Sequence, residues 1–320
     1  MATTTRRPVR RGPGPSRLRQ VLRLPVWAAI LMASAACELT SVEEIEPEDV
    51  VVVEAYLRPG GTQEVFVHRT LPGQDGSLRV DGATVELVGA DGRGGERRSR
   101  LQVTNTTEEC ASPAALLGGP AGTCYLGLFS ASPNQEYGLE VTTADGRRLE
   151  GTTTMPGDFG IRVPTADTCS LETDRLDITW TQAEGAWSYQ VVARFTGLAE
   201  GLAALGVEDP PDELELTGLA IGRADTTIVF PNEFGVFDRF TMDPAVLLAL
   251  QQGLPGGASA DIVVAAGDEN FVNWVRGGNF NPSGQVRVPS IVGDGTGVFG
   301  SLVTRRVTVL SQTPGYPFCQ

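Results

Sequence analysis

The sequence predicts an all-β protein made of two β-sandwich domains, the second with short helical insertions. Three features of the chain predict this class. Short runs of β-branched or alternating apolar residues recur, turns rich in glycine, proline and aspartate separate them, and few segments have a helical period. Strands with this spacing are typical of sandwiches, because each strand turns alternate side chains into a shared core.

The first predicted domain comprises residues 50–156. The Asp91-Gly92 and Asp145-Gly146 pairs indicate hairpin turns, in which glycine supplies the positive φ. A Met-Pro-Gly break ends the domain, whose length of about 105 residues is ordinary for a sandwich. Its strands are expected at 50–56, 63–69, 83–89, 99–105, 124–130, 137–143 and 148–154.

The second predicted domain comprises residues 157–320. Trp180, Ala186 and Tyr189 form the pattern W-x5-A-x2-Y, which resembles the strand pair of fibronectin type III domains, with its buried tryptophan and tyrosine. We therefore expect a fibronectin-III-like sandwich core. Its strands are expected at 176–180, 189–195, 214–223, 225–231, 260–267 and 303–312.

Helical insertions are expected at two places in the second domain. At 243–253, an aspartate cap and a proline at the first helical position start a helix that a glycine ends. At 268–278, Asp268 is the predicted cap. A third segment, 195–206, is an ambiguous helical candidate.

Residues 1–36 have the layout of a secretory signal peptide. Seven arginines and no acidic residue precede an apolar stretch that ends in small residues. The stretch, Leu24 to Ala36, has about 13 residues, against the roughly 20 that a permanent bilayer span requires. We therefore expect export of the chain and removal of this segment.

Cys37 directly follows the signal and is the predicted lipid attachment site. The run Ser34-Ala35-Ala36-Cys37 resembles a bacterial lipobox, in which the cysteine is acylated and becomes the mature N-terminus. Ser34 departs from that pattern, because leucine is usual at its place, and cleavage after Ala35 is the alternative. Several acyl chains, such as palmitate, would make the anchoring stable, since one chain binds a membrane only marginally.

Residues 37–49 are acidic, polar and without periodicity, which indicates a solvated tether. Without the seven arginines of the signal, 18 basic and 39 acidic residues remain, so the mature part carries a net charge of −21. This acidity argues against a nucleic-acid partner and against electrostatic adhesion to anionic lipid. Contact with the membrane is therefore expected through lipid on Cys37.

The other cysteines form an even set suited to pairing in an oxidising compartment. Four cysteines allow three connectivities, and the sequence cannot choose among them. Our working assignment pairs Cys110 with Cys124 and Cys169 with Cys319. In the chain-entropy view, the short loop would contribute about 3 kcal/mol to stability and the long one about 5 kcal/mol.

Candidates for catalysis are few, and we expect the protein not to be an enzyme. His68, the single histidine, lies in an alternating strand without a nucleophile elbow. The acid-rich stretch 208–215, with Asp209 and Asp212, contains two prolines and indicates a solvated loop, although a hydrolase could use such acids. We expect no cofactor and no metal ion, because the sequence has neither a nucleotide fingerprint nor clustered metal ligands.

Aromatic residues offer a candidate surface for a ligand or partner. Phe234 and Phe237 lie in the stretch VFPNEFGVFDRF at 229–240, which contains glycine and asparagine, and Trp274 belongs to a second aromatic group. Core packing is the favoured alternative, since large aromatic residues are mostly buried.

Several motifs together resemble the lipoprotein family called domain of unknown function 4249. The resemblance covers nearly the whole mature chain, while the serine of the lipobox, the lack of lysine and the cysteine pairs depart from the family pattern. The motifs are Cys37, VVVEAY (51–56), GATVELVGADG (82–92), TTTMP (152–156), NFNPSG (279–284) and GDGTGVFGS (293–301).

The resemblance implies a cell-envelope lipoprotein with an Ig- or transthyretin-like first domain, and it supplies no catalytic residue. Family genes often neighbour TonB-dependent outer-membrane receptors. This implies a lipid-anchored outer-membrane protein that serves as a non-enzymatic binding or accessory subunit in nutrient uptake. The alternatives are an envelope structural or adhesion module without a small ligand, and a carboxylate-dependent hydrolase. The GVFG motif, Gly297 to Gly300, is expected to serve the fold, with Val298 and Phe299 packed inward.

Overall fold

The computed structural model describes the chain from residue 48 onward, with gaps. The predicted signal, Cys37 and nearly all of the tether therefore lie outside the described residues, as do Phe237 and the NFNPSG motif. The described ranges are 48–73, 76–91, 95–104, 110, 122–218, 221–236, 242–276 and 287–320.

Two sheets account for the strands of the described part, which confirms the predicted all-β class. One sheet has fourteen strands and the other has three, and the three helices within the described ranges are short. The seven strands predicted in the first domain are all present. They are β1 (Val51–Leu57), β2 (Thr62–Arg69), β3 (Thr84–Ala90), β4 (Glu96–Val103), β5 (Thr123–Leu128), β6 (Glu136–Thr142) and β7 (Arg148–Thr154).

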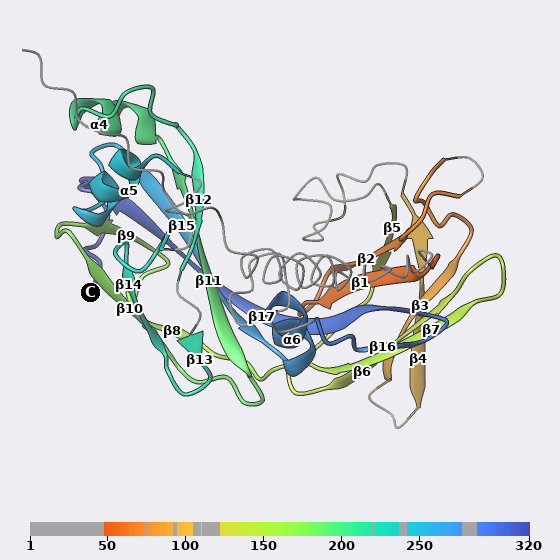
Figure 1. Cartoon of the computed structure of the whole chain (residues 1–320). Helices are drawn as coiled ribbons and strands as arrows, with labels where there is room; N and C mark the ends of the chain where they lie inside the picture. Colours follow the sequence, from red (N-terminus) through yellow and green to blue (C-terminus); the bar gives the residue numbers. More distant parts are fainter. Residues whose placement is uncertain are drawn as a thin grey trace, which may run out of the picture. The chain divides into compact units, whose positions relative to one another are not determined.

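These seven strands form a sandwich in which β4 passes from one layer to the other (Figure 1). Strands β1, β2 and β5 make one layer, and β3, β6 and β7 make the other. The first part of β4 pairs with β3, and its last two residues, Gln102 and Val103, pair with β5. Burial alternates along β3 and β7, as one buried sheet face requires, whereas β1 is buried on both faces.

The second half of the chain adds a second pair of facing sheets. Strands β14, β10 and β8 form the smaller sheet, which packs against β11. The strands are β8 (Ile161–Val163), β9 (Thr168–Leu171), β10 (Leu176–Trp180), β11 (Ser188–Thr196), β12 (Leu214–Thr217), β13 (Ile221–Gly222), β14 (Thr227–Phe230), β15 (Ser259–Gly267), β16 (Ile291–Gly293) and β17 (Gly295–Ser311). The strand predicted at 214–223 is thus interrupted, and β8, β9 and β16 were not predicted.

The W-x5-A-x2-Y motif packs between these two sheets, as predicted. Trp180 of β10 and Tyr189 of β11 are buried, and their ring centroids lie 5.3 Å apart. The Tyr189 hydroxyl accepts a hydrogen bond from the Ala183 amide at 2.7 Å, so the tyrosine also fixes the turn between the two strands. Phe195 stacks on Phe230 of β14 and extends the same aromatic core.

Strand β17 differs most from the sequence prediction, because it begins at Gly295 and not at residue 303. Its first part runs parallel to β1, from Val51 opposite Gly295 to Leu57 opposite Ser301. Its second part runs antiparallel to β15, from Leu302 to Leu310. One strand of seventeen residues, about 55 Å long if straight, therefore serves both sandwiches.

Strand β16 likewise pairs with β7 of the first sandwich. Residues 291–301 thus complete the sheets of the first sandwich, although the sequence places them in the second domain. The boundary at 156/157 itself stays a prediction.

The GVFG motif serves the fold, as predicted. Val298 and Phe299 are fully buried. Gly297 has a φ of 135°, and a Cβ built there would lie 2.0 Å from the Val53 carbonyl oxygen of β1. A Cβ on Gly300 would lie 2.9 Å from the Phe271 amide. Glycine is required at both places because the backbone of β17 lies against its neighbours.

The three helices begin where local signals place them. Helix α4 (Leu198–Ala204) follows directly after β11, which resolves the ambiguous segment 195–206: the strand ends at Thr196 and the left-handed Gly197 starts the helix. Helix α5 (Pro244–Gln251) is capped by Asp243, which accepts from the Ala245 amide at 2.8 Å. Helix α6 (Glu269–Arg276) follows Asp268. Among the described helices, none has the length and apolarity to cross a bilayer.

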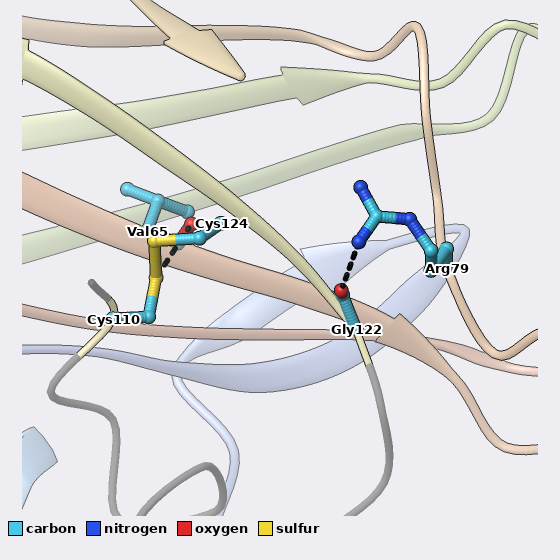
Figure 2. The surroundings of a disulfide bond; sticks show 5 residues. All are labelled: Val65, Arg79, Cys110, Gly122 and Cys124. Carbon is cyan, nitrogen blue, oxygen red and sulfur yellow. Dashed lines mark hydrogen bonds between the residues drawn. A yellow bond between two sulfur atoms is a disulfide. The ribbon is translucent and has the colours of Figure 1, made fainter. Parts of the chain in front are cut away.

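Both working disulfide assignments are confirmed. Cys110 is bonded to Cys124 of β5, with Cα atoms 5.7 Å apart, and its sulfur lies 4.0 Å from the Val65 carbonyl of β2 (Figure 2). Cys169 of β9 is bonded to Cys319, with Cα atoms 5.0 Å apart. The second bond links Cys319 to strand β9.

Replacement of Gly297 by alanine should destabilise the protein by more than about 3 kcal/mol, because the added Cβ meets the β1 backbone at a φ that alanine disfavours. Gly256→Ala is the control: a Cβ there meets no atom within 4 Å, and the change should stay within about 0.5 kcal/mol. Urea unfolding followed by tryptophan fluorescence measures both. Equal stability of the two variants would contradict the role given to Gly297.

Candidate functional site

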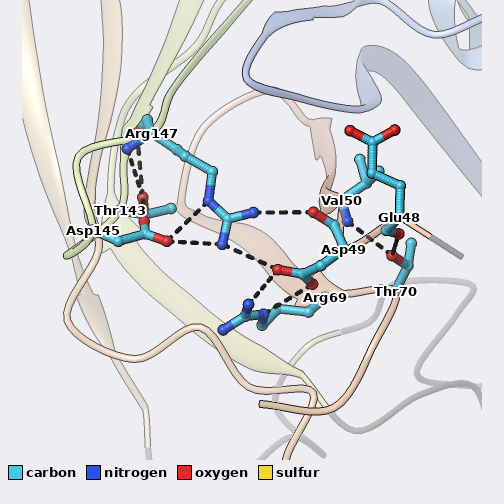
Figure 3. A network of polar contacts seen from close by, with 8 residues as sticks. All are labelled: Glu48, Asp49, Val50, Arg69, Thr70, Thr143, Asp145 and Arg147. Carbon is cyan, nitrogen blue, oxygen red and sulfur yellow. Dashed lines mark hydrogen bonds and ion pairs between the residues drawn. The ribbon is translucent and has the colours of Figure 1, made fainter. Parts of the chain in front are cut away.

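The junction between tether and sandwich is held by a network of charged side chains (Figure 3). The Asp49 carboxylate pairs with the Arg69 guanidinium through two contacts, and Arg147 donates to the same carboxylate at 3.4 Å and to the Asp49 carbonyl at 3.3 Å. Arg147 also pairs with Asp145 at 2.8 Å. Two arginines from different layers therefore hold the first described residues in place.

This network lowers the pKa of two carboxyl groups. The hydrogen bond from Arg69 is the main cause of the lowered pKa of Asp49, and Arg147 adds to it. The hydrogen bond from Arg147, followed by that from Thr143, brings the pKa of Asp145 to about 2. Both groups therefore stay ionised in weak acid and contribute stability only while charged.

A second polar network lies where β17 passes from β1 to β15. The Asp268 carboxylate is almost fully buried and accepts from the Thr153 hydroxyl at 2.5 Å, the Phe271 amide at 2.9 Å and the Ser301 amide at 3.1 Å. The Ser301 hydroxyl lies 2.8 Å from that of Thr153 and donates to the Thr154 carbonyl at 3.2 Å. Strands β7 and β17 and the start of α6 are thus joined through one carboxylate.

Burial raises the pKa of Asp268 above its ordinary value, although the hydrogen bonds that the carboxylate accepts act in the opposite direction. Its position as helix cap and strand link identifies it as a structural residue. Its oxygens accept hydrogen bonds from three protein donors.

Two hollows flank an exposed tryptophan close to this network. The first, of about 570 Å³, is lined by the turn 182–187 and by Arg223. The second, of about 330 Å³, is lined by residues 152–154, Gly185, Trp187 and the start of α6. Trp187 belongs to both, and 40% of its surface is exposed. Side chains from β7, the turn that precedes β11 and the start of α6 thus meet at one surface.

A further hollow, of about 570 Å³, lies between α4, α5 and the turn that follows β9. Glu172, Asp174 and Glu200 make it acidic, and alanine, glycine and proline make up half of its remaining lining residues. The described part of the chain contributes no basic side chain to its lining.

The aromatic surface predicted from the sequence is wrong for the two residues that are described. Phe234 is 2% exposed and packs edge-on against Phe230, and Trp274 is 8% exposed with Arg287 over its ring. Both are core residues, because the turn after β14 and helix α6 direct these side chains inward. Phe237 lies outside the described residues.

Trp187 is the aromatic residue that sequence reasoning missed. It has the same parity as the buried Tyr189, so alternation would place it inward. It escapes burial because β11 begins only at Ser188. The sequence contains no signal for this exposure.

The remaining candidates lie apart from one another. His68 is buried in β2, as its place in an alternating strand predicted, and its Nδ1 lies 3.2 Å from the Arg69 carbonyl oxygen. Asp209 and Asp212 are exposed, and Asp212 accepts from the Ala199 amide at the start of α4. Within the described ranges, no three histidine, cysteine or acidic side chains gather as metal ligands would.

These features define an all-β sandwich protein with two disulfides and polar networks that join its strands. The chain belongs to the DUF4249 family, a domain of unknown function, whose family model matches residues 38–211. The family resemblance drawn from the motifs is thereby confirmed. No curated protein matches the chain.

Solved structures give distant similarities only. The fibronectin FN1–FN3 domains of chicken CNTN1 share 11% identity over 82% of this chain and 69% of theirs, with a TM-score of 0.20. The fibronectin(III)-like modules of Clostridium thermocellum CbhA share 10% identity over 84% of this chain and 99% of theirs, also with a TM-score of 0.20. A cycloalternan-degrading enzyme from Trueperella pyogenes shares 9% identity over 78% of this chain and 33% of its own, with a TM-score of 0.22. At these TM-scores the similarities carry no argument.

Replacement of Asp268 by alanine should cost about 2–4 kcal/mol, because two amides and a hydroxyl lose their acceptor in a buried place. Asp268→Asn keeps an acceptor for both amides and should cost less than about 1 kcal/mol at neutral pH, since it also avoids burying a charge. Urea unfolding compares the variants. A loss as large for asparagine as for alanine would show that the charge itself is needed.

Asp49→Asn should lower stability by about 1 kcal/mol at neutral pH, a small value because solvent screens the partly exposed ion pairs. The lowered pKa of Asp49 means that its contribution is present above the ordinary pKa near 4 and is lost as pH falls. Acid unfolding between about pH 5 and pH 2 should therefore have a shallower slope in the variant.

The control for this change is Glu150→Gln on β7, an exposed carboxylate with no ion pair within the described residues. If this variant alters the acid transition as much as Asp49→Asn does, the effect comes from the change in net charge and not from the loss of the Asp49 network.

Proposed function

We propose that the protein is a lipid-anchored outer-membrane protein that binds a ligand or partner without catalysing a reaction, as an accessory subunit of a nutrient-uptake system. The observation that carries this proposal is that β1, the first strand after the predicted tether, and the acidic hollow lie at opposite ends of β17. Val51 of β1 lies opposite Gly295, the first residue of β17, and the acidic hollow is lined by Gln312, which directly follows the last residue of that strand.

The length of β17 separates these two places. The acidic hollow lies up to about 50 Å along the strand from the point where the tether enters. A chain anchored through Cys37 would therefore enter the first sandwich at the opposite end of β17 from this hollow. Such a placement suits the presentation of a binding surface, and the Asp49 network would keep the junction firm.

The cysteine count supports the anchor. The two disulfides account for four of the five cysteines, and Cys37 is the fifth. A thiol in an exported protein either pairs with another chain or is modified. Its position behind a signal-like segment favours acylation.

The placement of the acidic side chains supports a role without catalysis. Asp49, Asp145 and Asp268 are engaged in structural networks, and Asp209 and Asp212 lie on an exposed turn. A paired-carboxylate hydrolase needs two acids that face one reactant. These five acids are not arranged as such a pair, which supports binding without catalysis.

Intact mass measurement of the membrane-fraction protein tests the anchor. The expected mature chain begins at Cys37 and carries acyl mass, and Cys37→Ser should yield an unacylated chain that leaves the membrane fraction. An unmodified chain that begins at Ala36 would contradict the anchor.

Affinity purification of the tagged protein from detergent-solubilised membranes tests the partner. Recovery of a TonB-dependent outer-membrane receptor supports the accessory role. An acylated protein that is recovered without any receptor would favour an envelope structural or adhesion module. Cys37→Ser is the control, because a protein released from the membrane should no longer recover the receptor.

A further inference from the structure

We propose that the surface around Trp187 binds a neutral saccharide chain, with the indole ring as a platform between the two flanking hollows. This inference names a ligand class for the proposed binding function and rests on it. The groups that carry it are the exposed indole and the polar side chains on either side of it.

The exposure of Trp187 distinguishes it from the other described tryptophans. Trp180 is 1% exposed and Trp274 is 8% exposed, whereas Trp187 leaves 40% of its surface in contact with solvent. A single exposed apolar residue is common on protein surfaces and by itself indicates nothing. Here the ring also lines both hollows, so it forms the ridge of a built surface.

The walls of the two hollows are mainly polar. On one side the lining includes Gln182, Glu184 and Arg223, all exposed. On the other side the lining includes the exposed Thr152 and Glu269. The buried and hydrogen-bonded pair Thr153 and Asp268 also lines this hollow. Glu184, Arg223 and Glu269 form no ion pair within the described part of the chain, so their donors and acceptors remain available to a ligand.

This combination suits a sugar ring. A pyranose has an apolar face of C–H groups and a rim of hydroxyls, so it can stack on an aromatic face while its hydroxyls bond to carboxylates, amides and guanidinium groups. A chain of sugars crossing Trp187 would place one unit over the indole and its neighbours in the two hollows. An apolar peptide would leave these polar walls without partners.

The charge of the protein points to a neutral ligand. The mature part carries −21, and both hollows contain carboxylates, so an anionic polysaccharide would be repelled. Arg223 is the cation among the lining residues, and it stands beside Glu184 in the same hollow.

The backbone of the turn that carries the platform is also held in place before any ligand binds. The Trp187 amide donates to the Gly267 carbonyl of β15 at 2.9 Å, and the Ala186 amide donates to the Ala183 carbonyl at 3.3 Å. The Tyr189 hydroxyl accepts a hydrogen bond from the Ala183 amide and so fixes the same turn. A rigid platform reduces the entropy that binding must overcome, which favours recognition of a flexible glycan.

Isothermal titration of the purified full-length protein with a panel of neutral oligosaccharides tests the proposal. The panel contains hexasaccharides of α-1,4-, β-1,4- and β-1,3-linked glucose, of β-1,4-linked mannose and of β-1,4-linked xylose. At least one should bind at millimolar concentration or below and shift the tryptophan emission. Trp187→Ala should weaken that binding by at least about tenfold, because the stacking surface is lost.

Tyr316→Ala is the matched control, since Tyr316 is another exposed aromatic residue and lies outside both hollows. It should bind as the unaltered protein does, and Arg223→Ala should show an intermediate loss. Absence of binding across the panel, or equal affinity of Trp187→Ala and the unaltered protein, would overturn the proposal.

Failure of this inference and failure of the proposed function can be told apart. If the protein recovers a receptor but binds no glycan, the accessory role is supported and the saccharide site is contradicted. If the protein binds a glycan but has an unmodified N-terminus, the saccharide site is supported and the lipid anchor is contradicted.

Discussion

The pairing of β17 with both β1 and β15 is the constraint on which the rest of the structure depends. The strand completes the layer that begins at Val51 and the layer that contains β11 and β15. Neither sandwich is closed until the last residues of the chain are available, because the contacts of β17 with β1 join segments far apart in sequence. Pairings of this kind cost loop-closure entropy before they return any stabilisation.

The glycines and the buried carboxylate of Asp268 make this shared strand possible. Gly297 and Gly300 let the backbone lie closer to β1 and to α6 than any side chain would allow. At the point where β17 changes partners, the Ser301 amide and hydroxyl require partners of their own. Asp268 and Thr153 supply them, so the buried network follows from the geometry of the strand.

The same crossing point also creates the surface around Trp187. Strand β7 of the first sandwich, the turn that precedes β11 and the start of helix α6 meet there because β17 pairs or packs with the elements that carry them. The exposed indole therefore stands beside polar side chains from distant parts of the chain. The acidic hollow between α4 and α5 has a different origin, since it lies among the helical insertions at the far end of β17. Two surfaces with distinct chemistry are thus available for recognition.

The sequence by itself determined most strands, the cap of α5, the disulfide parity and the family, because these depend on alternation, turn residues and motifs within short windows. It left open whether Phe234 and Trp274 lie in the core, it placed the start of β17 at residue 303, and it gave no signal for the exposure of Trp187. The tertiary structure alone decided these four, since each depends on what a distant segment covers. Glycine-rich residues 293–301 carry little strand propensity of their own, and pairing with β1 makes them a strand.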